Sequence, residues 1–491
     1  MANLASSSSS PDRDTSLATV ADADRMGRFP LTMAWWAVCS AIFYIVVGAT
    51  LALNYGARNA IIGMVLSVLS YGLINAVISR YAIRTGQSVA LFSRSVFGTS
   101  GAALATLIFF ATAIYYAVFE GSVMAVAAHH MFPSVPYWAF ALLVVIYSVL
   151  LIFGSVQRWL DKFNGVLLPF YLGGLLLAVV LATREYGYSD AWLAFGPAGG
   201  PVAGGWWDAY VYYMGVWILM MFTFDYARFG RREDARYHGR YNFGMPFYLV
   251  TFLLNGVAGI YLVATIPGDG ALSEVSVVLA LLKLMGLGGL FFVWVTQTRI
   301  NTANYYLATI NMQAFFARFG LGRWPKAAWA VVVGLVSYAL MLFDVFAYLL
   351  QALAYQGIFV VAWVAVALVH ILAVGETAPA PGGGSAYNRR GLGAWFAGAA
   401  SGLALMHVSG LAATFAAPAS FVVAGVVYWL GQAAVGDDAL NRIGQQRHFA
   451  VVPKRDAAAV VTRPAAVAHR AAIPGHLAQI SQGLVEKTAT R

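Results

Sequence analysis

Long apolar runs, separated by short polar segments, recur along most of the chain. Each run approaches the length of about 20 residues that an α-helix needs to span the hydrocarbon core of a bilayer. The pattern predicts an all-α integral membrane protein with about twelve transmembrane helices, and a short, half-buried helix outside that count at 272–285. The predicted helices are centred near Tyr44, Ser70, Tyr115, Tyr147, Leu175, Trp217, Asn255, Asn301, Leu335, Val360, Leu403 and Gly425.

Two of the predicted helices contain glycines that could interrupt them. Gly48 follows a bulky run in the first helix, and Gly215 lies within the sixth. Transporters built from inverted repeats break two helices at equivalent positions and expose backbone to a substrate or an ion. Because the two helices are five apart, the pattern favours a break at each glycine. Close helix packing is the alternative reason for a glycine at either position.

The eighth predicted helix carries a polar run at membrane depth. It reads TQTRINTAN over 296–304, polar on every side, and Arg299 lies near the middle of the apolar span 286–316. Arginine at such a position costs roughly 3 kcal/mol on insertion scales, so the run must pack inside the bundle or line a cavity. The pattern favours a binding site. The alternative is a buried brace in which Arg299 pairs with Glu120 of the third helix.

Glu120 is a candidate proton carrier, because a buried carboxyl can bind and release a proton near the working pH. Five helical residues turn the chain by about 140°, so Tyr115 and Glu120 do not share one narrow face. Tyr116, four residues before Glu120, shares its face better. A contact of Glu120 with Arg299, with the substrate or with a neighbouring helix is left open.

Composition and charge agree with a membrane protein. The chain of 491 residues is 60% hydrophobic and 10% charged, with a net charge of +10, whereas soluble domains are roughly one-quarter charged. Arg and Lys gather in alternate loops, which places both termini in the cytoplasm and the protein in the cell (inner) membrane. The net charge reflects this bias and a basic tail, so nucleic acid is not an expected partner. The residues of the inward loops are Arg80, Arg84, Arg94, Arg158, Lys162, Arg228, Arg231, Arg232, Arg236, Arg240, Arg318, Arg323, Lys326, Arg389 and Arg390.

The chain divides into a transporter domain and two tails. Ser- and Asp-rich sequence before the first helix, and Ala, Arg and Pro after the last, lack apolar periodicity and predict disorder. The expected parts are a disordered cytoplasmic tail at 1–28, a twelve-helix domain at 29–436 and a disordered cytoplasmic tail at 437–491. Within the domain they are a first repeat at about 31–183, a second at about 205–374 and two extra helices at about 393–435.

The sequence offers little for catalysis or for a metal. Its one cysteine, Cys39, excludes an internal disulfide and disfavours a cysteine-based metal site. His129, His130 and His370 are scattered among different helix ends, and no cluster of catalytic side chains is apparent at depth. We therefore expect neither an enzyme nor a bound metal or cofactor.

Three stretches resemble the nucleobase:cation symporters, the family that includes purine, cytosine, hydantoin and allantoin permeases. They are RYAIRTGQSVALFSRSVFG at 80–98, FDYARFGR at 224–231 and RINTAN at 299–304, within a match over about 35–373. The resemblance implies the leucine-transporter fold, in which two inverted five-helix repeats are followed by two more helices. It also implies import of a planar heterocycle by alternating access.

The resemblance further implies the residues of the substrate site. An aromatic residue on the third helix and a Trp on the sixth sandwich the substrate ring in the family, and these positions fall on Tyr115 and Trp217. The family's hydrogen-bonding Asn falls on Asn304, whose amide suits a lactam edge. Phe119 stands where the family has a Gln, and the acidic Glu120 follows it. The candidate substrate-binding residues are Tyr115, Trp217, Asn304, Phe119, Gly48 and Gly215.

Sodium-coupled members of this fold bind the ion between the broken first helix and two hydroxyl residues of the eighth. Those positions fall on Thr298 and Arg299. A guanidinium brings a permanent charge and five donors to a place where a cation needs oxygen lone pairs. Like charges at about 4 Å repel by roughly 4 kcal/mol at an effective dielectric near 20. We hypothesise that Arg299 donates to carbonyls near 47–50 and replaces sodium, which leaves proton coupling, exchange or facilitated transport.

Asp225 and Arg228 lie at the inner end of the sixth helix and are expected to form a gate or an anchoring ion pair. The expected partners of the protein are the lipid bilayer, a small heterocycle and, as a coupling ion, the proton. Two alternatives stay open. One is a sodium-independent carrier of the same fold for amino acids or cationic amines, and the other is a receptor that does not transport.

Overall fold

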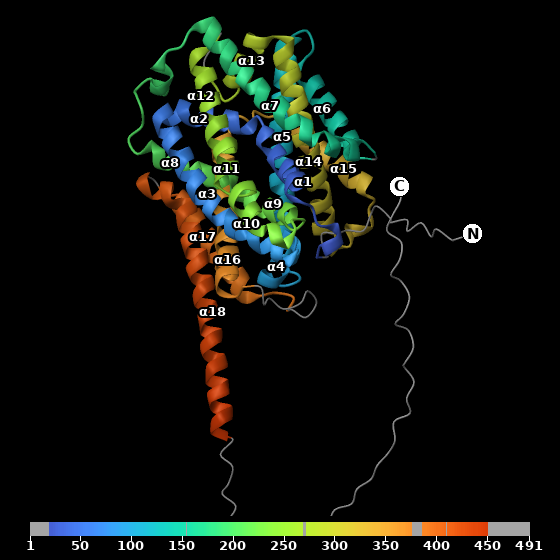
Figure 1. Cartoon of the computed structure of the whole chain (residues 1–491), viewed down its shortest axis with the longest axis vertical. Coiled ribbons are helices and arrows are strands. Elements are labelled where there is room, and N and C mark those ends of the chain that lie inside the picture. Colours follow the sequence, from blue (N-terminus) through green and yellow to red (C-terminus); the bar gives the residue numbers. More distant parts are fainter. Residues whose placement is uncertain (1–18, 154, 269–271, 376–384, 409, 450–491) are drawn as a thin grey trace, which may run out of the picture. The chain divides into compact units, whose positions relative to one another are not determined.

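The computed structural model describes residues 19–153, 155–268, 272–375, 385–408 and 410–449. Within these ranges the chain is helical, apart from loops and one isolated bridge between Met26 and Gly230. Every predicted helix centre falls within a helix or a helical turn, and the short helix expected at 272–285 is present as α13. The helices are α1 (Arg28–Trp36), α2 (Phe43–Tyr55), α3 (Ala57–Thr85), α4 (Val89–Phe97), α5 (Ala103–Met131), α6 (Tyr137–Leu151), α7 (Ser155–Tyr186), α8 (Gly205–Met214), α9 (Ile218–Ala227), α10 (Ala235–Tyr237), α11 (Met245–Tyr248), α12 (Asn255–Thr265), α13 (Ser276–Met285), α14 (Leu287–Phe316), α15 (Lys326–Met341), α16 (Leu349–Ala373), α17 (Arg389–Met406) and α18 (Ala416–Phe449) (Figure 1).

The helices have the length and surface of membrane spans. Among the described residues, six are long and apolar enough to cross a bilayer, and a seventh span forms if the bent pair Arg28–Ser40 and Phe43–Tyr55 is counted as one. The helices α6, α13 and α15 are apolar but shorter. Large apolar side chains such as Leu73, Leu176 and Leu335 are more than half exposed. Such side chains suit helices that face lipid, because the bilayer core is itself apolar.

The first membrane helix is broken between α1 and α2, where its axis bends by 42°. A 3-10 turn, Ala37–Ser40, ends the first half, and α2 begins at Phe43. Gly48 lies inside α2, so the predicted break at this glycine is wrong. A Cβ atom on Gly48 would come within 2.4 Å of the Gly256 Cα atom in α12. Gly48 therefore allows two helix backbones to approach closely, which was the alternative reading of this position.

Two polar side chains from other helices form hydrogen bonds with backbone groups at the break. The Nδ2 atom of Asn255 donates to the carbonyl of Cys39 at 2.8 Å. The Oε1 atom of Gln297, in α14, accepts a hydrogen bond from the backbone N–H of Ile42 at 3.2 Å. These bonds supply partners for backbone groups that a continuous helix would have satisfied internally, as a membrane segment requires.

The sixth membrane helix is broken close to the predicted position. A 3-10 turn, Gly215–Trp217, separates α8 from α9. A Cβ atom on Gly215 would lie 2.3 Å from the carbonyl oxygen of Leu353 in α16, so only glycine fits this contact. The carbonyl of Gly215 accepts a hydrogen bond from the Nε2 atom of Gln356 at 2.7 Å. The break is therefore stabilised by α16.

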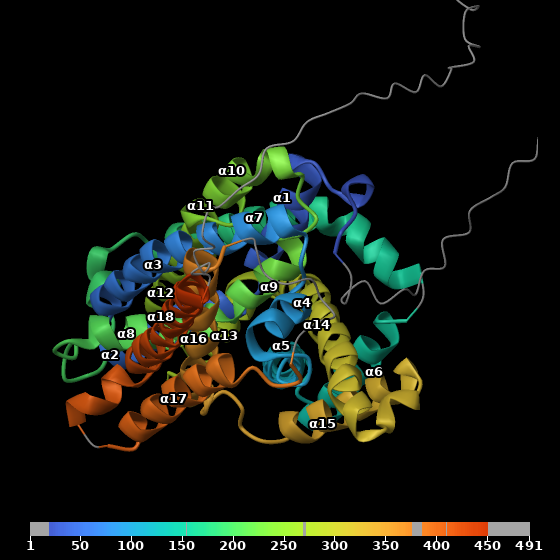
Figure 2. The ribbon, with the colours of Figure 1, turned by 90° about the horizontal axis from the view of Figure 1, so that it is seen from below.

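The third and eighth membrane helices, α5 and α14, lie side by side along much of their length (Figure 2). The helix α2 packs against α12, and α3 packs against α8 and α9. The turn Ala37–Ser40 of the first membrane helix packs against α14, and Phe222 of α9 contacts Phe109 of α5. Both broken helices therefore adjoin the pair α5 and α14, which carries the polar groups predicted to act at membrane depth.

The segment 19–28, expected to be disordered, packs against the helices instead. The Nη1 atom of Arg25 donates to the carbonyls of Ile83 and Gly230, each at 2.6 Å. The Arg25 side chain also forms a 2.9 Å salt bridge with Asp22. A buried guanidinium that supplies donors to carbonyls at helix ends gives this segment a fixed place.

The chain divides into two compact units, Met1–Asp437 and Asp438–Arg491. The helix α18 continues to Phe449, past the expected end of the last helix near 435. The remainder of the two expected tails, 1–18 and 450–491, lies outside the described residues.

Candidate functional site

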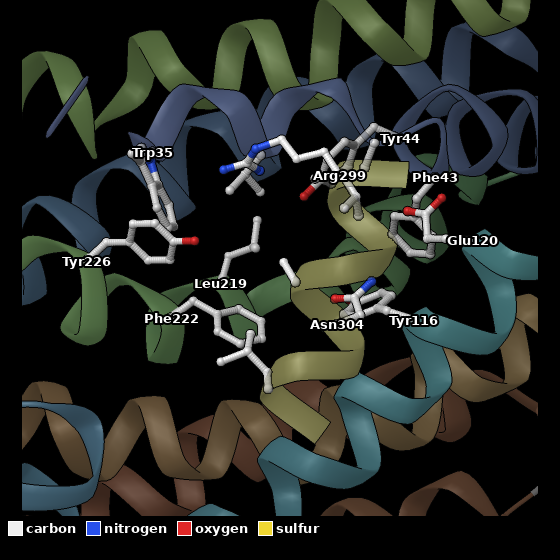
Figure 3. Close-up of a pocket in the computed structure, with 15 residues that line it drawn as sticks. Trp35, Phe43, Tyr44, Tyr116, Glu120, Leu219, Phe222, Tyr226, Arg299 and Asn304 are labelled. Carbon is white, nitrogen blue, oxygen red and sulfur yellow. The ribbon is translucent and has the colours of Figure 1, made fainter. Parts of the chain in front are cut away.

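A hollow, which we call the central cavity, lies where the break of the first helix faces α5, α9 and α14 (Figure 3). Its volume is about 70 Å³, below the roughly 300–1,000 Å³ typical of small-molecule sites. The first helix contributes Trp35, Val38, Ala41, Phe43 and Tyr44 to its lining. A lining of aromatic and aliphatic side chains with few polar groups is typical of sites that bind small organic molecules.

Three residues singled out from the sequence meet in the central cavity: Glu120 of α5, and Arg299 and Asn304 of α14. All three are buried, with exposed fractions of 1%, 8% and 8%. Figure 3 shows the Arg299 side chain extending towards Trp35, while the Glu120 carboxyl lies on the other side of the cavity beside Phe43. No salt bridge joins Glu120 to Arg299 in the part of the chain that the structure describes. The alternative of an Arg299–Glu120 brace is therefore wrong.

The face that α5 turns to the cavity differs by one residue from the prediction. Tyr116 and Glu120, four residues apart, line the central cavity. Tyr115 instead lines a second hollow on the far side of α5, together with residues of α16 and α17. Phe119 packs edge-on against Phe43, with ring centroids 5.1 Å apart. Tyr115 and Phe119 thus lie outside the central cavity, and the pairing of Tyr116 with Glu120 on one face is confirmed.

The sixth helix also presents residues other than the predicted one. Trp217 packs edge-on against Tyr71 and Phe421, with ring centroids 6.0 and 5.6 Å apart, and is not among the cavity-lining residues. Leu219 and Phe222, one and two turns into α9, line the cavity in its place. Gly215 shapes the break behind them and does not line the cavity either.

A hydrogen-bonded chain connects the cavity to the break of the sixth helix. The Nε2 atom of Gln356, in α16, donates to the Tyr116 hydroxyl at 3.2 Å and to the carbonyl of Gly215 at 2.7 Å. One side chain therefore links α5, α16 and the turn between α8 and α9. No feature of the sequence pointed to Gln356, which lies in a mostly apolar helix.

Side chains of the polar run of α14 face α6, the break of the first helix and the central cavity. Thr298 and Asn301 face α6: the Tyr147 hydroxyl donates to the Thr298 hydroxyl at 3.1 Å, and the Asn301 Nδ2 atom donates to the Ser148 hydroxyl at 3.0 Å. Gln297 faces the break of the first helix, as described above, and Arg299 and Asn304 face the cavity. The Thr296 and Thr302 hydroxyls donate to carbonyls of α14 itself. This division explains why the run is polar all round, since none of its sides meets lipid.

Arg299 lies beside the break of the first helix. It lines the central cavity together with Val38 and Ala41. The carbonyls near 47–50, the predicted acceptors, belong to the continuous helix α2. Arg299 therefore lies beside the break, which occurs earlier in the chain than the carbonyls predicted to accept its hydrogen bonds.

Asp225 and Arg228 lie at the end of α9, away from the central cavity. An oxygen of the Asp225 carboxyl accepts a hydrogen bond from the backbone N–H of Val89 at 3.2 Å, at the first residue of α4. The Arg228 guanidinium lies over the ring of Phe229, 4.9 Å from its centroid. Asp225 thus joins the end of α9 to the start of α4.

Several cavity residues were missed from the sequence. Tyr44 and Trp35 flank a break that has no Gly or Pro to announce it. Tyr226 falls within the FDYARFGR stretch and could have been singled out there, whereas nothing distinguishes Phe222 from other apolar residues of its helix. Among the described residues, no three His, Cys, Asp or Glu side chains converge as ligands of a metal ion would.

No protein-family model matches the chain, and no curated protein matches it. Solved structures do. Mhp1, described as a nucleobase-cation-symport-1 family transporter, in a closed conformation with bromovinylhydantoin bound, is 14% identical, with a TM-score of 0.64 over 87% of this chain and 96% of that one. The inward-facing conformation of Mhp1 gives a TM-score of 0.66 at 14% identity, over 87% and 94%.

A Na⁺-coupled sialic acid symporter, in a substrate-bound outward-open state, is 11% identical, with a TM-score of 0.53 over 82% of this chain and 90% of that one. At such identities the likeness establishes the arrangement of the helices and not what the protein carries. The chain is an all-α, multi-pass membrane protein with the leucine-transporter fold.

Proposed function

We propose that the chain is a secondary transporter of the nucleobase:cation symporter group, which imports a small planar heterocycle by alternating access. The observation that carries the proposal is the central cavity, where a broken helix, aromatic faces and a few polar side chains meet. The rings of Tyr116 and Phe222 offer faces for a flat π-system, and the Asn304 amide offers both a donor and an acceptor to its edge. Mhp1, which has the same fold, is described with bromovinylhydantoin bound.

The proposal includes the orientation and organisation expected from the sequence. Loops rich in Arg and Lys favour a cell (inner) membrane protein with both termini in the cytoplasm. The transporter domain would occupy 29–436, with repeats at about 31–183 and 205–374 and extra helices at about 393–435.

Transport is proposed to be independent of sodium. Arg299 lies beside the break of the first helix, where sodium-coupled relatives of this fold are expected to hold the ion, and a guanidinium provides donors but no acceptor. The neighbouring hydroxyl of Thr298 faces α6, where it accepts from Tyr147 and donates to the carbonyl of Trp294 at 2.6 Å. Of the two α14 positions that would have to supply oxygen ligands, one carries a guanidinium, and the hydroxyl of the other bonds Tyr147 and the Trp294 carbonyl.

The test is uptake by the purified protein in liposomes. Ring compounds that raise the unfolding temperature would be taken forward as labelled substrates, and their uptake would be compared in sodium and in potassium at equal ionic strength. Uptake by the wild type should be the same in both salts. A steep rise with sodium would show that the assignment of Arg299 is wrong.

Two variants sharpen this test. Arg299→Ser exchanges the guanidinium for a hydroxyl, and we expect it to lose uptake in potassium and to regain part of it in sodium. Arg58→Ser removes an exposed arginine near the start of α3 and should change uptake in neither salt.

A further inference from the structure

The Glu120 carboxyl is buried in the central cavity without a counter-charge. Its exposed fraction is 1%, and its Oε2 atom has no hydrogen-bond partner. In the described part of the chain no Lys, Arg or His pairs with it, and Arg299 extends away from it (Figure 3). Buried carboxylates are normally paired or coordinate a metal, because an isolated one is costly in a medium of low dielectric.

The carboxyl is surrounded by groups that could bind a flat ligand, namely an aromatic ring and a side-chain amide. Tyr116, one turn before Glu120, is held by the hydrogen bond from Gln356, so its ring has a fixed place in the cavity. The Nδ2 atom of Asn304 also lacks a hydrogen-bond partner, and its side chain lies beside Tyr116 in Figure 3. A ring that stacks on Tyr116 would thus bring one edge to an unpartnered carboxyl and one polar group to an unpartnered amide.

The two oxygens of a carboxylate accept hydrogen bonds and donate none. An amidine-type edge, in which a ring nitrogen stands next to an exocyclic amino group, presents two parallel N–H donors when the ring nitrogen carries a proton. It matches a carboxylate as a guanidinium does, with two charge-assisted hydrogen bonds. A lactam edge presents one N–H and one carbonyl oxygen, and that carbonyl would face a carboxylate oxygen with no donor between them.

We propose that Glu120 selects heterocycles with an amidine-type edge, such as aminopyrimidines and aminopurines, by pairing with that edge through both carboxylate oxygens. The inference rests on the proposed function, since it names the class of ring that the central cavity takes. The ring binds together with one proton taken up from water, which supplies the positive charge that the protein does not supply at Glu120, and the proton leaves the cavity with the ring.

The experiment is equilibrium binding to the purified full-length protein with two matched pairs of rings. Cytosine and adenine carry the amidine-type edge, and uracil and hypoxanthine are their oxo counterparts of nearly equal size. We expect the amino member of each pair to bind roughly 10- to 100-fold more tightly, the range of a hydrogen bond to a charged group. Glu120→Gln replaces one acceptor oxygen by a donor with little change of shape, and it should abolish or reverse this preference. Glu185→Gln makes the same change at an exposed position and should preserve the wild-type ratio.

The outcomes separate the inference from the function on which it rests. A wild-type preference for the oxo rings, or an equal ratio in the wild type and in Glu120→Gln, overturns the role of Glu120 while ring transport stands. Absence of binding and uptake for every ring overturns the proposed function and the inference together. If Glu120→Gln does not fold, the ratio of the dissociation constants of oxo and amino rings in the wild type still tests the predicted preference.

Discussion

The hydrogen-bonded link through Gln356 gives a prediction that can be worked out from the structure. Gln356→Leu keeps a side chain of similar size and removes both donated bonds, at 2.7 Å to the Gly215 carbonyl and at 3.2 Å to the Tyr116 hydroxyl. Leaving a buried acceptor without its donor costs about 1–3 kcal/mol, and a neutral hydrogen bond contributes about 1 kcal/mol. We therefore expect a loss of about 2–4 kcal/mol in the free energy of unfolding, which is a large part of the stability of an ordinary domain.

The assay is thermal unfolding of the purified protein, followed by uptake in liposomes. The variant should unfold at a lower temperature and bind ring substrates more weakly, because the Tyr116 ring loses the bond that fixes it. Asn311→Leu is the matched control, since the Asn311 Nδ2 atom donates to the carbonyl of Leu307 within its own helix and links no other element. If Gln356→Leu unfolds no earlier than this control and binds substrate as the wild type does, the link contributes nothing and the reasoning fails.

Two further predictions concern residues whose place in the structure differs from the one predicted from the sequence. Tyr116→Ala should weaken ring binding by roughly 3- to 10-fold through the lost aromatic contact, whereas Tyr115→Ala should leave the dissociation constant of the ring unchanged. The reverse result in a binding titration would show that α5 presents the face of Tyr115 to the cavity. Gly48→Ala should lower the free energy of unfolding by about 1–3 kcal/mol through overpacking, because the new Cβ atom would lie 2.4 Å from the Gly256 Cα atom. The same variant should keep the wild-type selectivity among rings. Gly173→Ala, where nothing lies within 4 Å of the new atom, is its control in the same thermal unfolding measurement.

The eighth helix shows what a sequence pattern can predict. Eight of the nine residues at 296–304 are polar or small, so a position inside the bundle followed from the cost of exposing them to lipid. In the structure, Arg299 and Asn304 line the central cavity. Which neighbour Thr298 and Asn301 would meet could not be predicted, because that depends on where α6 packs.

The third helix shows where the pattern fails. Most residues of α5 are apolar, so periodicity does not reveal which face is turned inward. A shift of one residue rotates a side chain by about 100°, and this is the difference between Tyr115 and Tyr116. The spacing of four between Tyr116 and Glu120 was the one local feature that pointed to the correct face.

The break of the first helix could not be found locally. The residues from Ala37 to Ile42 include no Gly or Pro, and their conformation depends on Asn255 and Gln297, which are more than 200 positions away in the chain. The sequence pattern predicted the break at Gly48, but this glycine instead allows α2 and α12 to pack closely. The sixth helix was predicted more successfully because there one glycine serves both the break and the contact with α16.

The position of Cys39 offers a way to follow the protein at work. It is the only cysteine of the chain, it is fully buried, and it lies in the turn that separates α1 from α2. A maleimide or a methanethiosulfonate reagent added from one side of the membrane could modify it only when that turn becomes accessible to water from that side. The unaltered protein thus carries its own reporter of opening, and the rate of alkylation with and without a bound ring would measure how often each side is exposed.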